Sequence, residues 1–445
     1  MSDVGQTWSG THRFGARRLL EARSVSEVQD LLRSRPGAVR ALGTRHSFNE
    51  IADTEGTLVS VVGIPPEPRL TPRRDAVSVG GGIRYGELAA WLEQRGLALH
   101  NMGSLPHISV AGAMSTGTHG SGDRLAMLAD AVTAIEFVDA TGSLQRVESD
   151  DWRFGGFVVG LGAYGVVTRI ELAVQPSYRV SQRLYVGLDW DVLAARFDDV
   201  TASGTSVSVF THWGAPAVEH VLVKQRTDST FDTSVLETMR EADPSERFDG
   251  ASWTPQDGSE GPWMLRMPHF RLEETPSFGE EIQSEYFVPR THAPAAIAAV
   301  RGLAAEIDPH LIVTELRTIA ADGSWLGPAS GRDTVGIHFT WKQHEDAVRA
   351  LLPRIEDALA SYDVRPHWGK WNAFDAARIS AAYPRLSLAR TLYQELDPDG
   401  VFSNSYLERL GVRDEGVRCF HADVQPVPTV SRLSPSSIQR RASEA

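Results

Sequence analysis

The stretch RALGTRHSFNE, residues 40–50, contains the turn on which the interpretation of this sequence depends. An apolar run over residues 39–42 stops at Gly43, and Arg45 and His46 then stand side by side in a short polar segment. Turns favour Gly, Asn and Ser because of their backbone geometry, but that geometry does not require an arginine beside a histidine. The pair therefore indicates a chemical role for the turn, with His46 at its centre.

The chain has 445 residues, more than one ordinary hydrophobic core accommodates, so two or more domains are expected. The net charge of −13 argues against a nucleic-acid partner, because binding phosphates requires concentrated Lys and Arg. No run approaches the roughly 20 apolar residues of a membrane-spanning helix, so no membrane partner is expected.

The first residues, MSDVGQTWSGTHRFG, lack the apolar stretch of a secretory signal. Cys419 is the single cysteine, which excludes an intramolecular disulfide and a thiolate metal cluster. We therefore expect a protein of the reducing cytoplasm. The expected oligomeric state is a monomer.

Residues 1–176 alternate predicted strands and helices. Ser24 and Glu27 have the spacing of a capping box and predict that a helix starts there. A second helix is predicted over residues 87–95, closed by a glycine. Residues 131–147 predict a β-hairpin, since β-rich arms flank a turn of the sequence DATG.

Residues 177–365 have fewer glycine-rich turns and more Trp, His and Phe. Strands predicted over residues 310–320 and 334–341 alternate with helical stretches, which indicates an antiparallel sheet with helices on one face. Residues 366–411 are predicted to form a short helical segment. Residues 412–445 contain Pro, Ser and scattered charge without a period, so a disordered tail is expected. The predicted fold class is α+β with two domains.

Residues 160–165, GLGAYG, match the G-x-G-x-x-G fingerprint of dinucleotide binding. The fingerprint has meaning only between a strand and a helix whose N-terminus faces the pyrophosphate. Residues 166–174 alternate and are β-branched, so they predict a strand instead. We interpret the segment as a tight loop that can approach a ligand closely; an NAD-dependent dehydrogenase, colourless when purified, is the alternative.

Three segments contain more small and hydrogen-bonding residues than packing requires: residues 43–49, 101–122 and 367–370. The second is rich in Gly, Ser, Thr and His, and its interspersed apolar residues predict an ordered, buried path. Buried polar groups need partners, and backbone N–H groups and hydroxyls can line a phosphate-bearing ligand without a lysine. A large polar ligand is the simplest partner.

A second set of polar residues lies on predicted strands. Glu315 and Arg317 are two residues apart, so their side chains share a face, and a charge pair on an otherwise apolar strand needs a partner beyond a surface salt bridge. His338 and Thr340 repeat this spacing, and Lys370 adds an ammonium group. These groups suit a polyhydroxylated chain. The histidine spacings match no zinc motif, so no metal is expected.

On these motifs the sequence resembles the flavin-dependent oxidases of the vanillyl-alcohol oxidase type, and within them the alditol (xylitol) oxidases, with the sugar-lactone oxidases as close relatives. The motifs are GTRHSFNEIA, SLPHISVAGAMSTGTHGSG, GPWMLRMPHF, SEYFVPR, ELRT, GRDTV with HFTW, and RPHWGK. The resemblance implies a PCMH-type fold in which residues 1–176 bind FAD, residues 177–365 bind the substrate, and residues 366–411 close on the flavin.

The resemblance implies that the turn at 43–47 wraps the FAD pyrophosphate and that His46 is bonded covalently to the flavin C8-methyl group; a purely structural histidine is the alternative. Gly103 leaves space for O₂ beside the flavin. A glycine commonly precedes the linking histidine in this family, so Arg45 is a departure, with contact to the cofactor phosphate as its one suggested role. The other implied FAD-binding residues are Ala41, Leu42, Gly43, Thr44, Ser47, Ser104, Ser109, Gly112, Thr116, Gly117, Thr118, His119, Val166 and His367.

The implied activity is oxidation of the terminal hydroxyl of an alditol, such as xylitol or sorbitol, to the aldose, with O₂ reduced to H₂O₂. Arg317 and Lys370 are expected to lower the hydroxyl pKa by placing positive charge beside the developing alkoxide. The alternatives are a sugar-1,4-lactone oxidase or dehydrogenase, acting on gulono-, galactono- or arabinono-lactone, and a flavin-binding protein without activity. The implied substrate-binding residues are Ser104, Glu315, Arg317, His338, Thr340 and Lys370, with Ser104, Glu315, Arg317 and Lys370 also catalytic.

Overall fold

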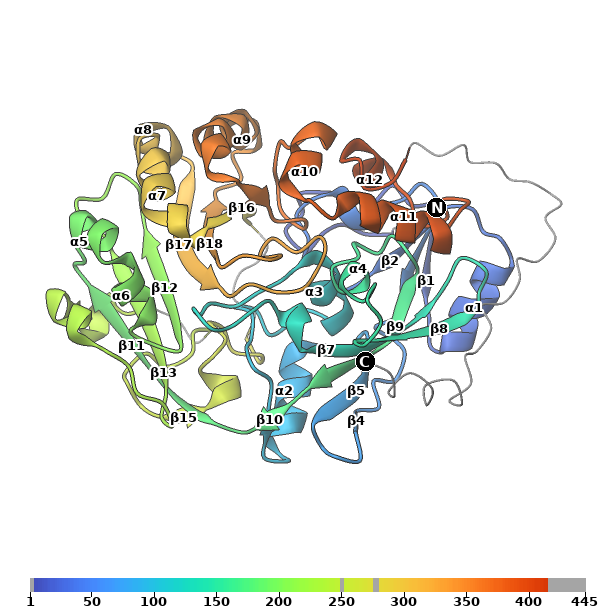
Figure 1. The fold of residues 1–445 in the computed structure, drawn as a ribbon, viewed down its shortest axis with the longest axis horizontal. Helices are drawn as coiled ribbons and strands as arrows, with labels where there is room; N and C mark the ends of the chain where they lie inside the picture. The colour runs from blue at the N-terminus through green and yellow to red at the C-terminus, as the bar shows by residue number, and fades with distance from the viewer. Residues whose placement is uncertain (1–3, 249–251, 275–279, 415–445) are drawn as a thin grey trace, which may run out of the picture.

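The computed structural model describes residues 4–248, 252–274 and 280–414. In Figure 1 the N-terminal sheets lie at the right and a large sheet lies at the left, with the C-terminal helices along the top. The α+β class predicted from the sequence is confirmed. In the described part of the chain, no helix is both long and apolar enough to cross a membrane.

A small parallel sheet opens the chain, in the order β1-β3-β2. Its strands are β1 (Arg18–Glu21), β2 (Val39–Leu42) and β3 (Thr57–Ser60). Helix α1 (Val25–Arg33) connects the first two strands, and its start is as predicted, since the Ser24 hydroxyl accepts a hydrogen bond from the Glu27 N–H. Its apolar residues pack in a buried cluster with Val39 and Val59. β2 ends where the turn at 43–49 begins.

The second sheet of the N-terminal part is antiparallel, in the order β4-β5-β9-β7-β8. The predicted hairpin is confirmed as the pair β7 and β8. The loop at 160–165 leads into β9 and not into a helix, so the condition for a dinucleotide fingerprint is not met. The strands are β4 (Arg69–Leu70), β5 (Ala76–Gly80), β7 (Val132–Val138), β8 (Leu144–Glu148) and β9 (Val166–Ala173).

Short elements connect these two sheets. The helix predicted over 87–95 is α2 (Tyr85–Glu93), two residues earlier than expected, and Gly96 follows it with a positive φ of 68°. The others are η1 (Glu50–Ala52), β6 (Leu97–Ala98), α3 (Val110–Thr116), η2 (Leu128–Ala131), α4 (Gly155–Val158) and β10 (Gln175–Pro176), which pairs with β6.

In the described part of the chain the large sheet has nine strands, all paired antiparallel, in the order β14-β11-β13-β12-β17-β18-β16-β19, with β15 beside β11. β17 and β18 are the two strands predicted from alternation. The strands are β11 (Arg179–Val186), β12 (Ser206–Thr211), β13 (His220–Arg226), β14 (Arg240–Glu241), β15 (Gly261–Pro262), β16 (Ile282–Pro289), β17 (Leu311–Ile319), β18 (Thr334–Trp341) and β19 (Arg365–Pro366).

Helices accompany the large sheet, and α7 packs against α9 and β16. The apolar side chains of α9, including Val348, Leu352 and Ile355, are buried. This leaves the opposite face of the central strands for polar side chains. The helices are α5 (Trp190–Ala195), α6 (Phe197–Ala202), α7 (Ala293–Arg301), α8 (Ala304–Ile307) and α9 (Glu345–Leu359), with short turns η3 (Ser234–Thr238), η4 (Pro244–Glu246), η5 (Trp263–Leu265), η6 (Arg290–His292) and η7 (Ala360–Tyr362).

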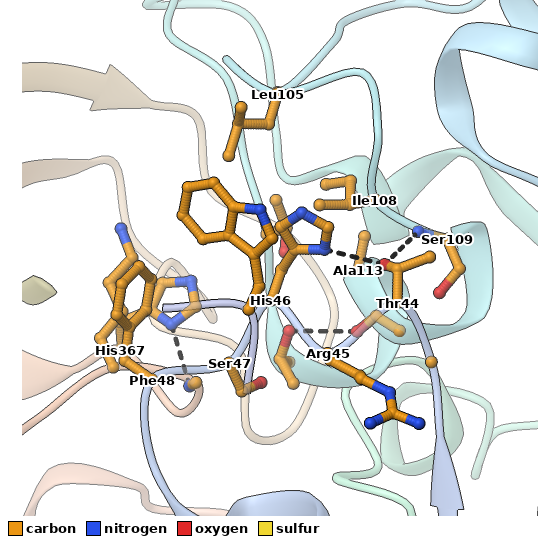
Figure 2. Close-up of a pocket in the computed structure, with 18 of the residues that line it drawn as sticks. Thr44, Arg45, His46, Ser47, Phe48, Leu105, Ile108, Ser109, Ala113 and His367 are labelled. Atoms are coloured by element: carbon orange, nitrogen blue, oxygen red, sulfur yellow. Dashed lines mark hydrogen bonds between the residues drawn. The ribbon is translucent and has the colours of Figure 1, made fainter. Parts of the chain in front are cut away.

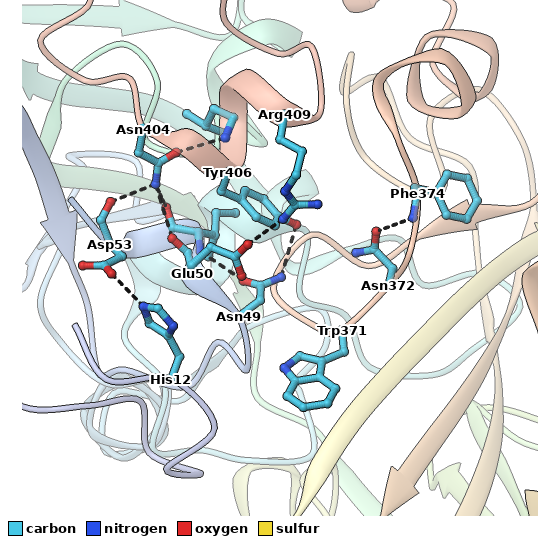
Figure 3. Close-up of polar contacts among 12 residues, drawn as sticks. His12, Asn49, Glu50, Asp53, Trp371, Asn372, Phe374, Asn404, Tyr406 and Arg409 are labelled. Carbon is cyan, nitrogen blue, oxygen red and sulfur yellow. Dashed lines mark hydrogen bonds and ion pairs between the residues drawn. The ribbon is translucent and has the colours of Figure 1, made fainter. Parts of the chain in front are cut away.

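The C-terminal helices return to the turn at 43–49, as Figure 3 shows. The Asn404 amide donates to the carbonyl of Asp53 at 2.8 Å, and the amide of Asn49 donates to the carbonyls of Trp368 and Lys370, each at 2.9 Å. Hydrogen bonds at the turn therefore join segments that are more than 300 residues apart in the sequence. The helices are α10 (Ala376–Ala382), α11 (Leu386–Leu396) and α12 (Ser405–Arg409).

The disordered tail was predicted from residue 412, but Val412 and Arg413 belong to the fold. Val412 is fully buried, and the Arg413 guanidinium pairs with the buried Asp397 carboxylate at 3.0 Å. These contacts keep Val412 and Arg413, the first residues of the segment 412–445, in the folded structure. The remainder, residues 415–445, lies outside the described residues.

Candidate active site

One cavity of about 380 Å³ brings the three polar segments of the sequence together with the central strands of the large sheet. The turn at 43–49, the segment 103–119 and residues 367–370 all contribute to its wall, together with side chains of β16, β17 and β18. The sequence-predicted residues in this wall are Ala41, Leu42, Gly43, Thr44, Arg45, His46, Ser47, Gly103, Ser104, Ser109, Gly112, Thr116, Thr118, His119, Glu315, Arg317, His338, Thr340, His367 and Lys370.

The turn after β2 is held against the start of helix α3 (Figure 2). The Thr44 hydroxyl accepts a hydrogen bond from the Ser109 N–H at 3.1 Å and lies 3.1 Å from Nδ1 of His46. A Cβ atom at Gly43 would lie only 2.7 Å from the Ser109 hydroxyl, so a larger residue here would require the Ser109 side chain to rotate away. The turn and the helix start thus form one wall of the cavity.

This wall fits the phosphates of FAD. Among the described residues, no acceptor pairs with the backbone N–H groups of Thr44, His46 and Ser47. The buried Ser109 hydroxyl also lacks a hydrogen-bond partner there. The turn residues are half-buried, and backbone N–H groups without a protein acceptor are suited to an anion. Phosphate oxygens would satisfy these donors.

His46 lies in this wall with its imidazole neutral. Burial lowers the pKa of His46 to about 4, so the ring carries a free lone pair at neutral pH. The indole of Trp8 stacks on the ring, with 5.3 Å between centroids and 25° between planes. A neutral, sterically fixed imidazole is the form required of a nucleophile toward a flavin methyl group.

Arg45 has the left-handed backbone conformation that glycine adopts easily, with a φ of 66°. Its guanidinium donates to the Val4 carbonyl at 3.0 Å and lies 5.7 Å from the centre of the Phe14 ring. In Figure 2 the side chain extends away from His46. The arginine therefore binds the N-terminal segment to the turn, and the suggested contact of its guanidinium with the cofactor phosphate stays a prediction.

Two predicted cofactor residues lie elsewhere. Val166 packs in a buried cluster with Val59 and Phe402, and its neighbour Val167 lines the cavity instead, because consecutive side chains of a strand face opposite sides. Gly117 ends helix α3 with a positive φ of 74°, and a Cβ atom there would point at Pro328. Gly117 is thus a helix cap.

The register of the large sheet aligns the substrate residues predicted from the sequence. Glu315 on β17 pairs directly with His338 on β18, which in turn pairs with Glu285 on β16. Because residues opposite each other share a face, three polar side chains form a row across the sheet. Arg317 is two residues from Glu315 and lies on the same face, as predicted.

Glu285 is the central residue that the sequence interpretation missed. Its carboxylate accepts hydrogen bonds from Nη2 of Arg317 and Nζ of Lys370, each at 2.7 Å, and lies 3.2 Å from Nε2 of His119. Its side chain is fully buried. Glu285 is the lone acidic residue of the strand IQSEYFVP, which is a weaker signal than the charge pair that identified Glu315, and it lies in the quoted motif SEYFVPR.

The charges of this cluster are coupled. Burial alone would raise the pKa of Glu285, but Lys370 and Arg317 hold it well below its ordinary value. Burial lowers the pKa of Lys370 despite its pairing with Glu285. The positive charge on Arg317 and Lys370 is therefore balanced by an ionised carboxylate and is fixed in position before a substrate binds.

Several polar groups that line the cavity have no hydrogen-bond partner within the described residues. Within the described residues, neither ring nitrogen of His338 has a hydrogen-bond partner, and Nε of Arg317 has none either. Burial lowers the pKa of His338 well below its ordinary value, so the ring is neutral and offers one donor and one acceptor. The Ser104 hydroxyl lies 3.5 Å from Nη1 of Arg317. These groups point to a hydroxylated ligand.

Comparison with known proteins agrees with this geometry. The FAD binding domain family matches residues 16–148, and the D-arabinono-1,4-lactone oxidase family matches residues 277–410. The chain is 43% identical over 415 residues to an alditol oxidase from a Streptomyces species (strain IKD472), covering 92% of this chain and 99% of that protein. It is 28% identical to L-gulono-1,4-lactone dehydrogenase from Mycobacterium tuberculosis, covering 92% and 99%.

A solved structure shares the fold. The crystal structure of cholesterol oxidase from B. sterolicum matches with a TM-score of 0.74 and 13% identity, covering 92% of this chain and 96% of that one. The fold and the FAD binding domain together define a flavin-dependent oxidoreductase of the vanillyl-alcohol oxidase type, which confirms the resemblance found in the sequence. Within this class, the chain belongs to the alditol oxidase family.

Proposed function

We propose that this enzyme is an alditol oxidase that converts a terminal CH₂OH group of a polyol such as xylitol or sorbitol to the aldehyde of an aldose. The observation that carries the proposal is the row of buried polar groups opposite the turn at 43–47, in which nitrogens of His338 and Arg317 beside the Glu315 carboxylate have no hydrogen-bond partner within the described residues. An extended polyol presents a hydroxyl on each carbon and can satisfy such a row.

We infer that FAD is held by the turn at 43–47 and helix α3, with His46 as its covalent attachment. The neutral ring of His46 and the Trp8 stack support this attachment. The bound flavin would supply the hydride acceptor for the substrate carbon, with O₂ as the final electron acceptor and H₂O₂ as the product. Gly103, where a Cβ atom would have no neighbour nearer than 3.6 Å, supports access of O₂.

The chain's own residues orient the reacting hydroxyl and hold its charge. Arg317 and Lys370 place positive charge beside the reacting oxygen and stabilise the negative charge that develops on it, and Glu285 fixes both cations in position. Ser104 and Glu315 bind hydroxyls nearby. His338 and Thr340 on β18 extend the binding row along the polyol.

A sugar-1,4-lactone oxidase or dehydrogenase is the second candidate, because the D-arabinono-1,4-lactone oxidase family matches residues 277–410. Steady-state formation of H₂O₂ separates the two. We expect kcat/KM for xylitol or sorbitol to exceed that for L-gulono- and L-galactono-1,4-lactone. A preference for a lactone would overturn the alditol proposal, and reduction of an added electron acceptor without H₂O₂ would overturn the oxidase proposal.

A further inference from the structure

Lys224, on β13, is a buried lysine close to the substrate row. Its side chain is fully buried, and in the described part of the chain no carboxylate forms an ion pair with it. Nζ donates to the Met267 carbonyl at 2.5 Å and to Nδ1 of His269 at 3.0 Å. Burial lowers the pKa of Lys224 to about 7. Because even a neutral amine has two N–H groups, both hydrogen bonds persist in either charge state.

His269 connects Lys224 to Glu315. Its Nε2 lies 2.8 Å from Oε1 of Glu315. Burial alone would raise the pKa of Glu315, but Arg317 and His269 hold it below its ordinary value, so the carboxylate is ionised and only accepts. Nε2 of His269 must therefore carry the hydrogen.

The other nitrogen of His269 accepts from Lys224. Burial and the neighbouring lysine lower the pKa of His269 to about 4, so the ring is neutral and Nδ1 has a lone pair. Packing between Trp253 and Phe210, at centroid distances of 5.8 Å and 5.6 Å, fixes the plane of the ring. The ring is thus defined in orientation, tautomer and charge.

We propose that Lys224 and His269 are positioning residues that hold the Glu315 carboxylate in place to accept a substrate hydroxyl. His269 occupies Oε1, whereas Oε2 lies 3.6 Å from Nε of Arg317 and 3.8 Å from Nδ1 of His338, on the side of the cavity. This inference rests on the proposed function, in which Glu315 binds a polyol. Because the ring stays neutral, it orients the carboxylate without cancelling its charge.

Three substitutions test the proposal by kinetics. Lys224→Met keeps the aliphatic stem and removes the donors, and we expect KM for xylitol to rise about tenfold, with kcat changed less than threefold, because a ground-state contact is lost. His269→Phe keeps the aromatic packing but removes the donor and has the same expected effect. His269→Gln keeps an N–H toward Glu315 and is expected to restore KM to within about threefold of the wild type.

The pair of His269 variants separates positioning from packing. A purely structural role predicts that Phe, the better aromatic substitute, preserves KM while Gln does not, and that result would overturn the proposal. Lys342→Met is the matched control, since among the described residues the exposed ammonium group of Lys342 donates only to the Pro309 carbonyl, and the KM of this variant is expected to be unchanged. An unchanged KM in Lys224→Met would also contradict the proposal.

A second measurement needs no substrate. Nitrogen NMR of isotope-labelled histidine side chains in the flavin-loaded protein is expected to show His269 neutral with its hydrogen on Nε2. In Lys224→Met the ring, which then faces Glu315 and Arg317 without the lysine, is expected to take up a proton at higher pH than in the wild type. A wild-type ring that is charged, or that carries its hydrogen on Nδ1, would overturn the positioning inference. Failure of xylitol oxidation with this NMR result intact would overturn the proposed function alone.

Discussion

Glu285 accepts a 2.7 Å hydrogen bond from Nζ of Lys370, and the same carboxylate accepts a second hydrogen bond from the neighbouring guanidinium of Arg317. Two cations that would otherwise repel each other in a buried cavity therefore share one counter-charge. This arrangement preorganises the positive charge that a developing alkoxide needs, and it makes Glu285 as important to the site as the two cations.

Replacing Glu285 with Gln leaves Lys370 buried without its paired carboxylate and leaves Arg317 with only the 3.6 Å contact to Glu315. We expect Glu285→Gln to lower the free energy of unfolding by about 3–5 kcal/mol, the typical cost of breaking a buried ion pair, as measured by urea denaturation. The control is Asp30→Asn, which removes the exposed pair between Asp30 and Arg33 and should cost less than about 1 kcal/mol. Equal losses in the two variants would show that Glu285 contributes no more than a surface carboxylate.

Lys370→Ala is expected to slow reduction of the flavin by xylitol about a hundredfold, the usual effect of losing one preorganised donor to a developing anion. The flavin content should stay at the wild-type level, because the phosphate wall of the cavity is formed by residues 43–47 and helix α3. Stopped-flow absorbance and flavin quantification provide the two values. A parallel loss of both would refute a catalytic role for Lys370.

The pH dependence of the same reaction follows from the charge on Lys370. Burial lowers its pKa below the ordinary 10.5, so the cation is lost, and the rate falls, at a lower pH than for an exposed lysine. Arginine keeps its charge over this range. In Lys370→Arg the alkaline fall in rate should disappear or move to higher pH; a fall at the wild-type pH would assign it to another group.

The left-handed backbone at Arg45 predicts an unusual order of stabilities. Arg45→Ala loses the hydrogen bond to Val4 and keeps the strained φ of 66°, whereas Arg45→Gly loses the bond but relieves the strain. We expect the Gly variant to be about 1 kcal/mol more stable than the Ala variant in urea denaturation. An Ala variant at least as stable as the Gly variant would contradict the assigned conformation.

The Trp8–His46 stack predicts how covalent attachment depends on the N-terminal segment. After acid precipitation, His46→Ala should release all its flavin, and Trp8→Ala should release a large fraction because the ring of His46 is no longer held, while Trp8→Phe should retain most of it. Trp152→Ala, at a tryptophan that is 73% exposed, is the control. Acid-stable flavin in His46→Ala would place the attachment at another residue.

Local signals in the sequence predicted the parts of the fold that short-range physics determines. Three features could be predicted because each depends on residues that are neighbours in the sequence. They are the helix cap at Ser24, the hairpin of β7 and β8, and the strand after the glycine loop. The same was true of the Glu315 and Arg317 pair, whose spacing alone places both side chains on one face.

The residues that were missed depend on pairing between distant strands. Glu285 and Lys224 meet the substrate row only through the order β13-β12-β17-β18-β16, which alternation within a single strand does not specify. Val166 was named as a cofactor residue from the resemblance, whereas Val167 lines the cavity, because the sequence does not say which face of β9 borders it. The role of Arg45 could not be predicted, because it depends on the left-handed backbone conformation of this residue, which the sequence does not show.

The central claim is that a polyol, bound along the row from Ser104 to Thr340, reduces the flavin. The most direct test mixes the flavin-loaded enzyme with xylitol without oxygen and follows the visible absorbance of the oxidised flavin. The account predicts complete bleaching by xylitol, followed on admission of O₂ by recovery of the absorbance and one H₂O₂ per flavin. Bleaching by a sugar lactone but by no polyol, with the flavin intact, would contradict it.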